Sequence, residues 1–501
     1  MDSFGSFLEL VKRYHLLTGI GDGLQFDQGT LMPKKGADAK GDQMALIETY
    51  KHEVLVRVGD MIPLLTRSGL TNEQETIIRE MNVLALRAQA LPEALVSEMA
   101  KQTARTHEAW GKAKAEKAFW PVAADFAKLV DLKRQAATAI ANALGNAGAT
   151  PYEALLWEYA PGASEASVSA MLDDLGEFLS ALVAKIRASG KTIDIGCLNG
   201  YEDSAAFSFA KTVVGTLGFN FESGVFFAPG NHPMTCRAGT QDVRISTWFR
   251  GGNLGALLFA SMHEAGHGMY EQSFAGEFAD TPLGQFADIA IHEGNSRFWE
   301  NMVGRSSLFW EYLFPKLQAA FPAQLHGVWF EQFYTAINAV NLNNFSRVSA
   351  DEVTYNLHII QRYMLERDLI NGKISVNDLP ELWNSISQKL FGIVPENDLQ
   401  GVLQDIHWYG AGLFGYFPTY TMGNLMAAQM LAAIEQAGVI DSRKILQGDF
   451  SAIRTWLSEN IWQHGRSYSS GELIKRATGA ELSAAAFKDY IGDKFASIYE
   501  L

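Results

Sequence analysis

The sequence predicts a mainly α-helical protein with one small antiparallel β-sheet. Residues 72–144 are dominated by alanine, leucine, glutamate and lysine, and their apolar residues recur at spacings of three and four. Between positions 218 and 250 the pattern changes to aromatic and alternating residues, which is typical of strands. The helical pattern resumes at Asn253 and continues nearly to the C-terminus.

The long helical segments have recognisable limits. Pro92 and Pro121 mark expected starts or breaks in the first helical region, because proline disrupts a helix interior. A second amphipathic segment covers residues 164–188 and should end at Ser189-Gly190. We therefore expect helices that are separated at these points.

The sheet is expected just before the helices resume. Residues 221–227 are rich in aromatic side chains, and residues 229–233 read Pro-Gly-Asn-His-Pro, which is typical of a turn. Residues 242–249 alternate as a strand does. We expect antiparallel pairing, with the strand near residues 242–249 at an edge where an extended peptide could pair with it.

Composition and charge exclude several classes of protein. The chain has 501 residues, of which 48% are hydrophobic and 19% charged, and these are globular values. A net charge of -15 repels phosphate backbones and anionic membranes, so we expect neither as a partner. The uncharged stretch 411–434 contains Pro418 and three glycines, which favours a buried interior segment over a membrane span.

The two cysteines and the first residues bear on location. Two cysteines, Cys197 and Cys236, do not suggest a disulfide framework, and they form no C-x-x-C pair that could be a structural zinc site. A cytoplasmic, reducing setting therefore fits best, although one disulfide between them stays open. Acidic residues interrupt the first apolar run, unlike in a signal peptide.

A His-Glu-x-x-His motif follows the predicted sheet. His263 and His267 lie four positions apart and so share one face of a helix, where both imidazoles can bind one zinc ion. Glu264 places a carboxylate beside the water that such a metal would bind. The alternative is a pair of core histidines. Gly266 and Gly268 each cost about 1 kcal/mol relative to alanine in a helix, which indicates a close approach of other backbone or substrate.

A third metal ligand is needed, because a catalytic zinc ion normally has three protein ligands and one water. Glu293 lies 26 residues after His267, which leaves room for a loop and a returning helix. His292 is adjacent but points to another side of any helix that carries Glu293. We favour Glu293 as the ligand and keep His292 as the alternative.

The metal motif belongs to an ordered series of motifs along the chain. They are Phe26–Gly36, His232–Met234, Asp242–Ser246, His263–His267, His292–Asn295, Arg347–Tyr355, Gly401–Trp408 and Gly415–Tyr420. In this order they resemble the motifs of the carboxypeptidase Taq family of metallocarboxypeptidases, and the resemblance covers about residues 26–479. The Gly-Val-Leu-Gln-Asp-Ile-His-Trp stretch matches the family's G-x-x-Q-D-x-H-W fully.

The chain departs from the family pattern at a few positions. Phe26 replaces a tryptophan, Met234 a phenylalanine, Ser246 a threonine and Asn295 a glutamine. Ser346 stands where the family usually has isoleucine or valine. None of these changes removes a metal-binding side chain, so they put the substrate preference in doubt rather than the reaction.

The resemblance implies a zinc-dependent enzyme, with cobalt as an alternative metal, that hydrolyses the C-terminal peptide bond of peptides with broad specificity. It implies that Glu293 completes the ligand set and that Glu264 is the general base. It also implies a homodimer and a helical fold with a deep active-site cleft. We expect a single unit over residues 1–501, in which residues 1–200 cover the cleft and residues 201–501 form the catalytic part.

Such an enzyme must recognise a terminal carboxylate and stabilise an oxyanion. Arginine binds carboxylates through two parallel hydrogen bonds, so Arg347 and Arg244 are the candidates, with Arg347 preferred. The other candidates are His407 and Tyr420 as donors to the oxyanion, Tyr416 as a substitute donor, and His232 as a contact to a substrate carbonyl or amide.

Two other functions compete with this interpretation. A related zinc oligopeptidase or dipeptidyl carboxypeptidase would share the metal and the base, but it would release larger products. A peptide-binding protein with a degenerate site is disfavoured by the intact set of metal-ligand candidates.

Overall fold

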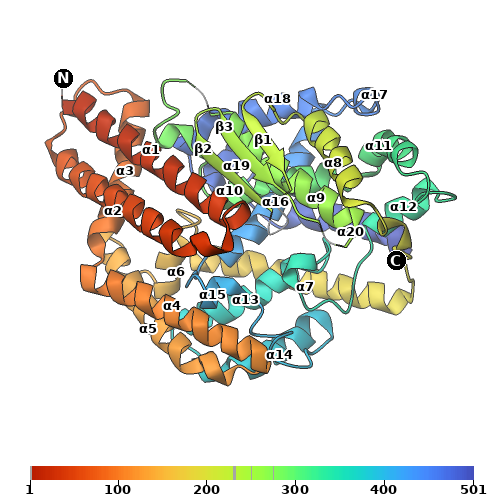
Figure 1. Ribbon diagram of the computed structural model, residues 1–501, viewed down its shortest axis with the longest axis horizontal. Coiled ribbons are helices and arrows are strands. Elements are labelled where there is room, and N and C mark those ends of the chain that lie inside the picture. Colours follow the sequence, from red (N-terminus) through yellow and green to blue (C-terminus); the bar gives the residue numbers. More distant parts are fainter. Residues whose placement is uncertain (1–2, 229–232, 250, 275) are drawn as a thin grey trace. The chain divides into compact units, whose positions relative to one another are not determined.

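The computed structural model describes residues 3–228, 233–249, 251–274 and 276–501. Within these ranges the chain is mainly helical, with one small sheet, as the sequence predicts (Figure 1). The helices are α1 (Ser3–Thr30), α2 (Ala37–Met61), α3 (Asn72–Ala90), α4 (Glu93–Glu116), α5 (Trp120–Ala143), α6 (Pro151–Leu156), α7 (Glu165–Ser189), α8 (Asp203–Leu217), α9 (Leu254–Gln272), α10 (Ile289–Arg297), α11 (Ser307–Ala320), α12 (Phe330–Ile337), α13 (Tyr355–Ile370), α14 (Leu379–Phe391), α15 (Ile406–Tyr409), α16 (Phe417–Gln436), α17 (Ser442–Ile445), α18 (Ser451–Asn460), α19 (Ser470–Thr478) and α20 (Ala485–Tyr499). The strands are β1 (Gly224–Phe227), β2 (Met234–Gly239) and β3 (Asp242–Ser246).

The predicted helix limits are confirmed. Pro92 is the residue before α4, and Pro121 lies in the first turn of α5, where its missing N–H costs no hydrogen bond. Ser164 caps α7 by accepting a hydrogen bond from the backbone N–H of Ser167. Gly190 ends α7 with a φ of 66°, a left-handed conformation that glycine adopts without strain.

The sheet differs from its prediction in two ways. β2 and β3 are antiparallel, but β1 and β3 are parallel, so the sheet is mixed rather than antiparallel. The strand order β1-β3-β2 also puts β3 in the centre, not at an edge. The reason is topological. After β1 the chain forms β2 at the opposite edge of the sheet, and a tight turn then leads into β3, which lies between β1 and β2. The residue pattern identifies strands but does not encode their order.

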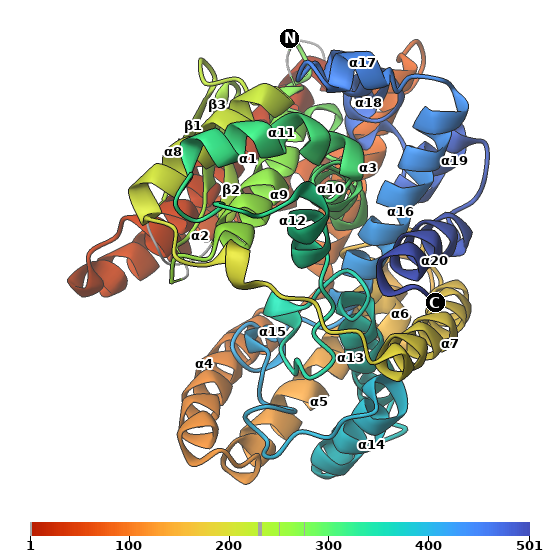
Figure 2. The ribbon, with the colours of Figure 1, turned by 90° about the vertical axis from the view of Figure 1, so that its right-hand side faces the viewer.

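The chain forms two compact units, each discontinuous in sequence. The first contains residues 1–88, 193–339 and 426–482, and the second contains residues 89–192, 340–425 and 483–501. In the first unit α1 lies beside α2 and packs on β2 (Figure 1). In the second unit α4 lies beside α5 (Figure 2). The predicted division near residue 200 concerns cleft and catalytic roles that these contacts do not test, so it stays a prediction.

The uncharged stretch after residue 411 forms most of α16, and its apolar side chains are buried as predicted. None of the helices in the described part of the chain combines the length and the apolar composition that a membrane crossing requires. Cys197 and Cys236 are both free thiols.

Candidate functional site

Helices α9 and α10 bring the candidate metal ligands together in the first unit. Asn253 caps α9 and Asp288 caps α10, each by accepting a hydrogen bond from a backbone N–H in the first turn. The two helices touch at Gly266, where an added Cβ would lie 2.7 Å from the Cα of Ser296. This contact is the close backbone approach that the glycine indicates, and it sets the distance between the histidines of α9 and Glu293 of α10.

His263, His267 and Glu293 form a cluster whose potential ligand atoms all lie within 4.8 Å of one another. The two histidine Nε2 atoms are 3.2 Å apart, and His263 Nε2 is 3.6 Å from Glu293 Oε2. Zinc bonds of about 2.0–2.1 Å at a tetrahedral angle would place two ligand atoms about 3.4 Å apart. The three side chains therefore fit a zinc ion in both type and spacing.

A second carboxylate orients His263. Glu300, in the π-helical turn that follows α10, lies 2.8 Å from His263 Nδ1 and accepts a hydrogen bond of 2.8 Å from Arg297. Burial opposes ionisation of Glu300, but Arg297 and His263 outweigh it and lower its pKa to about 2. An ionised carboxylate on Nδ1 leaves Nε2 as the metal-facing atom, which is a common arrangement in metal sites.

His292 points away from this cluster. Its Nε2 lies 3.1 Å from Glu271 Oε1, and its ring stacks on that of His267 with a centroid distance of 4.1 Å. Burial, and next the charge of His292, hold the pKa of His267 well below its ordinary value. His267 is therefore a neutral imidazole, the form that binds a metal.

Glu264 is buried, with 6% of its surface exposed, and its carboxylate accepts a hydrogen bond of 2.6 Å from the Thr235 hydroxyl of β2. Burial raises the pKa of Glu264, while His263 and the bond from Thr235 act against that rise. Glu264 is thus a carboxylate held in one orientation, with an affinity for protons above that of an exposed glutamate.

A cavity of about 280 Å³ in the first unit reaches Thr235 and His292 and is lined mainly by residues of α1 and β2. Met234 and Ser246, two of the departures from the family pattern, are register partners on β2 and β3. The N–H of Met234 donates a hydrogen bond of 3.1 Å to Ser246 Oγ. The two departures from the family pattern are therefore in direct contact, and Met234 lines the cavity.

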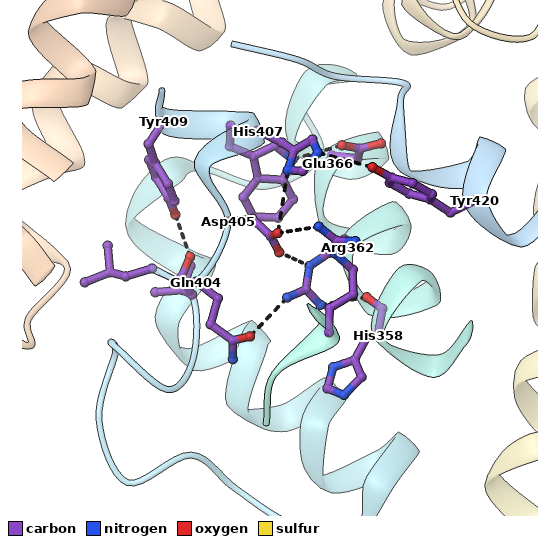
Figure 3. Close-up of polar contacts among 12 residues, drawn as sticks. His358, Arg362, Glu366, Gln404, Asp405, His407, Tyr409 and Tyr420 are labelled. Carbon is purple, nitrogen blue, oxygen red and sulfur yellow. Dashed lines mark hydrogen bonds and ion pairs between the residues drawn. The ribbon is translucent and has the colours of Figure 1, made fainter. Parts of the chain in front are cut away.

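The second unit contains a different charged cluster, around Asp405 (Figure 3). Arg347 donates a hydrogen bond of 3.2 Å to Asp405 Oδ1, and Arg362 of α13 donates to Asp405 Oδ2. Burial opposes ionisation of Asp405, but the two guanidinium groups hold its pKa well below the usual range. Asp405 is therefore ionised at neutral pH, and its carboxylate accepts hydrogen bonds from two arginines.

His407 and Tyr420 lie next to this aspartate. His407 Nδ1 is 3.6 Å from Asp405 Oδ1, and its Nε2 is 3.5 Å from the Tyr420 hydroxyl. Burial lowers the pKa of His407, so the ring is neutral. Tyr416 stacks edge-on against Tyr420 with a centroid distance of 5.3 Å. The structure thus brings together four predicted side chains of this unit: Arg347, His407, Tyr416 and Tyr420.

Two predicted residues do not join either cluster in the described chain. Arg244 of β3 donates two hydrogen bonds, of 2.9 and 2.7 Å, to Asp242, and both side chains are more than a third exposed. This local fork uses the Nε and Nη2 atoms of Arg244. His232 lies outside the described residues.

Sequence reasoning missed three charged groups near the candidates: Glu300 and Arg362, which bind candidate-site side chains, and Glu366, which binds Tyr152, Trp408 and Gly415. Glu300 is seven residues after Glu293, so helical continuation of the motif was a usable signal. Arg362 and Glu366 lie one turn apart on α13, outside any motif. A charged residue in an amphipathic helix usually faces water, so nothing in the pattern indicated their burial.

The chain is similar to known proteins over its whole length. The family model described as carboxypeptidase Taq (M32) metallopeptidase matches residues 6–495. Thermostable carboxypeptidase 1 of Thermus thermophilus is 35% identical, with 99% of both chains covered. Carboxypeptidase 1 of Bacillus subtilis is 30% identical, covering 99% of this chain and 98% of the relative.

Solved structures agree with this match. The crystal structure of the M32 carboxypeptidase from Deinococcus radiodurans has a TM-score of 0.94 at 32% identity, with both chains covered completely. That of the Pyrococcus furiosus carboxypeptidase has a TM-score of 0.92 at 31% identity, with 99% of each chain covered. The fold and the family resemblance are therefore confirmed together. The chain belongs to the carboxypeptidase Taq (M32) family of metallopeptidases and is a metallocarboxypeptidase.

Proposed function

We propose that this metallocarboxypeptidase works with zinc bound by His263, His267 and Glu293, with cobalt as an alternative metal. The observation that carries the proposal is the spacing of these three ligand atoms, all within 4.8 Å of one another. A zinc ion bound there would lower the pKa of a coordinated water and polarise the scissile carbonyl.

Glu264 is the proposed general base. Its carboxylate would take a proton from the attacking water and later give it to the leaving amine. Two features support this role: Thr235 fixes the carboxylate through a 2.6 Å hydrogen bond, and burial raises its pKa. A carboxylate that holds protons more tightly than usual is better suited to carry one from water to an amine.

Arg347 is the proposed binding residue for the terminal carboxylate of the substrate. It is a largely buried arginine, with 11% of its side chain exposed, and its two side-chain hydrogen bonds leave donors over. His407 and Tyr420 are proposed donors to the oxyanion, with Tyr416 as a substitute. His232 and Arg244 remain proposed contacts to the peptide.

Several finer properties are also proposals. Broad specificity and a homodimer are supported by the family resemblance, and a cytoplasmic location by the low number of cysteines, both of which are free thiols. The catalytic part is proposed to lie in residues 201–501, with residues 1–200 covering a deep cleft. Light scattering of the purified protein tests the dimer.

The reaction is tested with an N-terminally blocked dipeptide and a longer peptide, before and after chelation, with products followed by mass spectrometry. We expect single C-terminal residues to be released, activity to disappear on chelation, and zinc or cobalt to restore it. Release of dipeptides or internal cleavage would refute the proposed substrate position. Elemental analysis of the untreated protein identifies the metal.

A further inference from the structure

The cluster around Asp405 contains two arginines that differ in how completely they are held. Arg362 donates to Asp405 Oδ2, as Figure 3 shows, and Arg347 donates to Oδ1 of the same carboxylate. A pair of one arginine and one aspartate would be neutral, so the second arginine is not needed to satisfy Asp405. The second arginine must therefore have another role.

Burial, hydrogen bonds and an aromatic ring hold the Arg362 guanidinium in place. It is completely buried, and besides Asp405 it donates a hydrogen bond of 2.8 Å to the His358 carbonyl and one of 3.3 Å to Gln404 Oε1. Its guanidinium plane lies 4.8 Å from the Trp383 ring centroid. A substrate could not reach this buried group, and each of its three nitrogens already donates one hydrogen bond.

The Arg347 guanidinium has N–H donors left for a further hydrogen bond. The only hydrogen bonds of the Arg347 side chain within the described residues are the one to Asp405 and a long one of 3.5 Å to the Tyr355 hydroxyl. Its Nε is buried and has no hydrogen-bond partner among the described residues. Its guanidinium also lies 5.1 Å from the ring centroid of Tyr420, a proposed donor to the oxyanion. This arginine is placed to accept a further anion.

The charges of the three side chains do not cancel. Arg347 and Arg362 contribute two positive charges and Asp405 one negative charge, which leaves an excess of one positive charge. His407 is neutral. Glu366, one turn further along α13, binds the Tyr152 hydroxyl, the Trp408 indole N–H and the Gly415 N–H instead. Burial raises the pKa of Glu366 to about 7, so below that pH it is protonated and the excess charge lies on the arginine pair, of which only Arg347 is partly exposed.

We infer that Arg362 is a positioning residue for recognition of the terminal carboxylate. Because Arg362 binds the same Asp405 carboxylate as Arg347, the three side chains together keep one positive charge. That charge allows Arg347 to bind the terminal carboxylate of the substrate. The inference rests on the proposed role of Arg347. Asp405 then orients Arg347, and Arg362 supplies the charge that would otherwise be cancelled.

The test compares inhibition by an N-blocked amino acid with inhibition by its amide, using the metal-loaded, full-length enzyme. The ratio of the two inhibition constants measures how strongly the site prefers a carboxylate. Arg362→Met makes the three side chains neutral overall, so we expect this ratio to fall at least tenfold. KM for a blocked dipeptide should rise more than kcat falls.

The double variant Arg362→Met, Asp405→Asn separates charge from packing. It removes opposite charges together, leaves no unpaired buried ion, and restores one net positive charge on Arg347. We expect it to recover most of the preference for the carboxylate. A double variant that folds but shows no recovery overturns the inference, even if Arg362→Met alone fails to fold. Arg362→Lys keeps the charge and should lose little of the preference.

The role of Arg347 is tested separately by Arg347→Met. Loss of the carboxylate preference in this variant, with normal metal content and thermal midpoint, supports the role on which the inference depends. An unchanged preference would refute that role while leaving the metal and the base in place. An unchanged ratio in Arg362→Met, together with a reduced ratio in Arg347→Met, would refute the role of Arg362 alone.

Discussion

The two charged clusters of this enzyme are built in opposite ways. Around the metal-ligand candidates of α9 and α10 lie three carboxyl groups, Glu264, Glu293 and Glu300, so this cluster is rich in carboxylates. The cluster around Asp405 holds two arginines against one aspartate and carries an excess of positive charge. The first suits a metal cation, and the second suits the anionic end of a peptide.

The clusters also differ in how the chain assembles them. The first is formed by two capped helices that are close in sequence and meet at Gly266. The second joins Arg347, Arg362 and Asp405, which come from three separate segments. Local helix geometry thus determines most of the first cluster, whereas tertiary packing determines the second.

Glu264→Gln should have the largest effect on activity. The amide cannot accept the proton from water, so we expect kcat to fall by roughly 10²–10⁴-fold, the usual contribution of a general base. The metal content should stay the same, because His263, His267 and Glu293 remain. Substantial activity in a fully metal-loaded variant would show that another group is the base.

The contrast between the clusters explains what the sequence predicts. The i, i+4 spacing fixes His263 and His267 on one helix face, so two of the proposed ligands follow from local geometry. Glu293 needed only the connection over residues 273–288 and a second helix. The burial of Arg362 depends on Trp383 and Gln404, which are distant in sequence. No periodicity encodes such contacts, and the same limit applies to the order of the three strands.

The pH dependence of stability tests the state of Glu366, which lies next to the second cluster. Burial raises its pKa from 4.5 to about 7. The folded state therefore binds this proton more tightly than the unfolded state, and the resulting stability is complete below pH 4.5 and is lost as pH rises through 7. The effect amounts to at most about 3 kcal/mol. Glu366→Gln does not titrate, so its thermal midpoint relative to the wild type should rise between pH 5 and pH 8. A constant difference would show that Glu366 is ionised throughout.

Glu300→Gln tests the support of the first cluster. The amide keeps the size of the side chain but weakens the contact to His263 Nδ1, so the imidazole is a poorer and less oriented ligand. We expect metal affinity to fall by about 10–100-fold, as is typical for partners of metal-binding histidines. Competition with a chelator measures this. Once saturated with metal, the variant should recover most of its kcat, unlike Glu264→Gln.

Gly266→Ala should have the smallest but most specific effect, because it acts on the helix contact alone. Its Cβ would lie 2.7 Å from the Cα of Ser296 and 2.8 Å from the Asn295 carbonyl oxygen, so α9 and α10 must separate slightly. Such overpacking costs about 1–3 kcal/mol, and it should also weaken metal binding by moving Glu293 away from the histidines.

Gly111→Ala is the matched control for that change. Gly111 lies inside α4, where an added Cβ meets nothing within 4 Å, so this substitution should stabilise the protein by roughly 0.5–1 kcal/mol and leave the metal affinity unchanged. Thermal midpoints and chelator competition on both variants give the comparison. If Gly266→Ala behaved like Gly111→Ala, the spacing of the ligands would not depend on the close contact of the two helices, and local geometry would explain less of the first cluster than argued above.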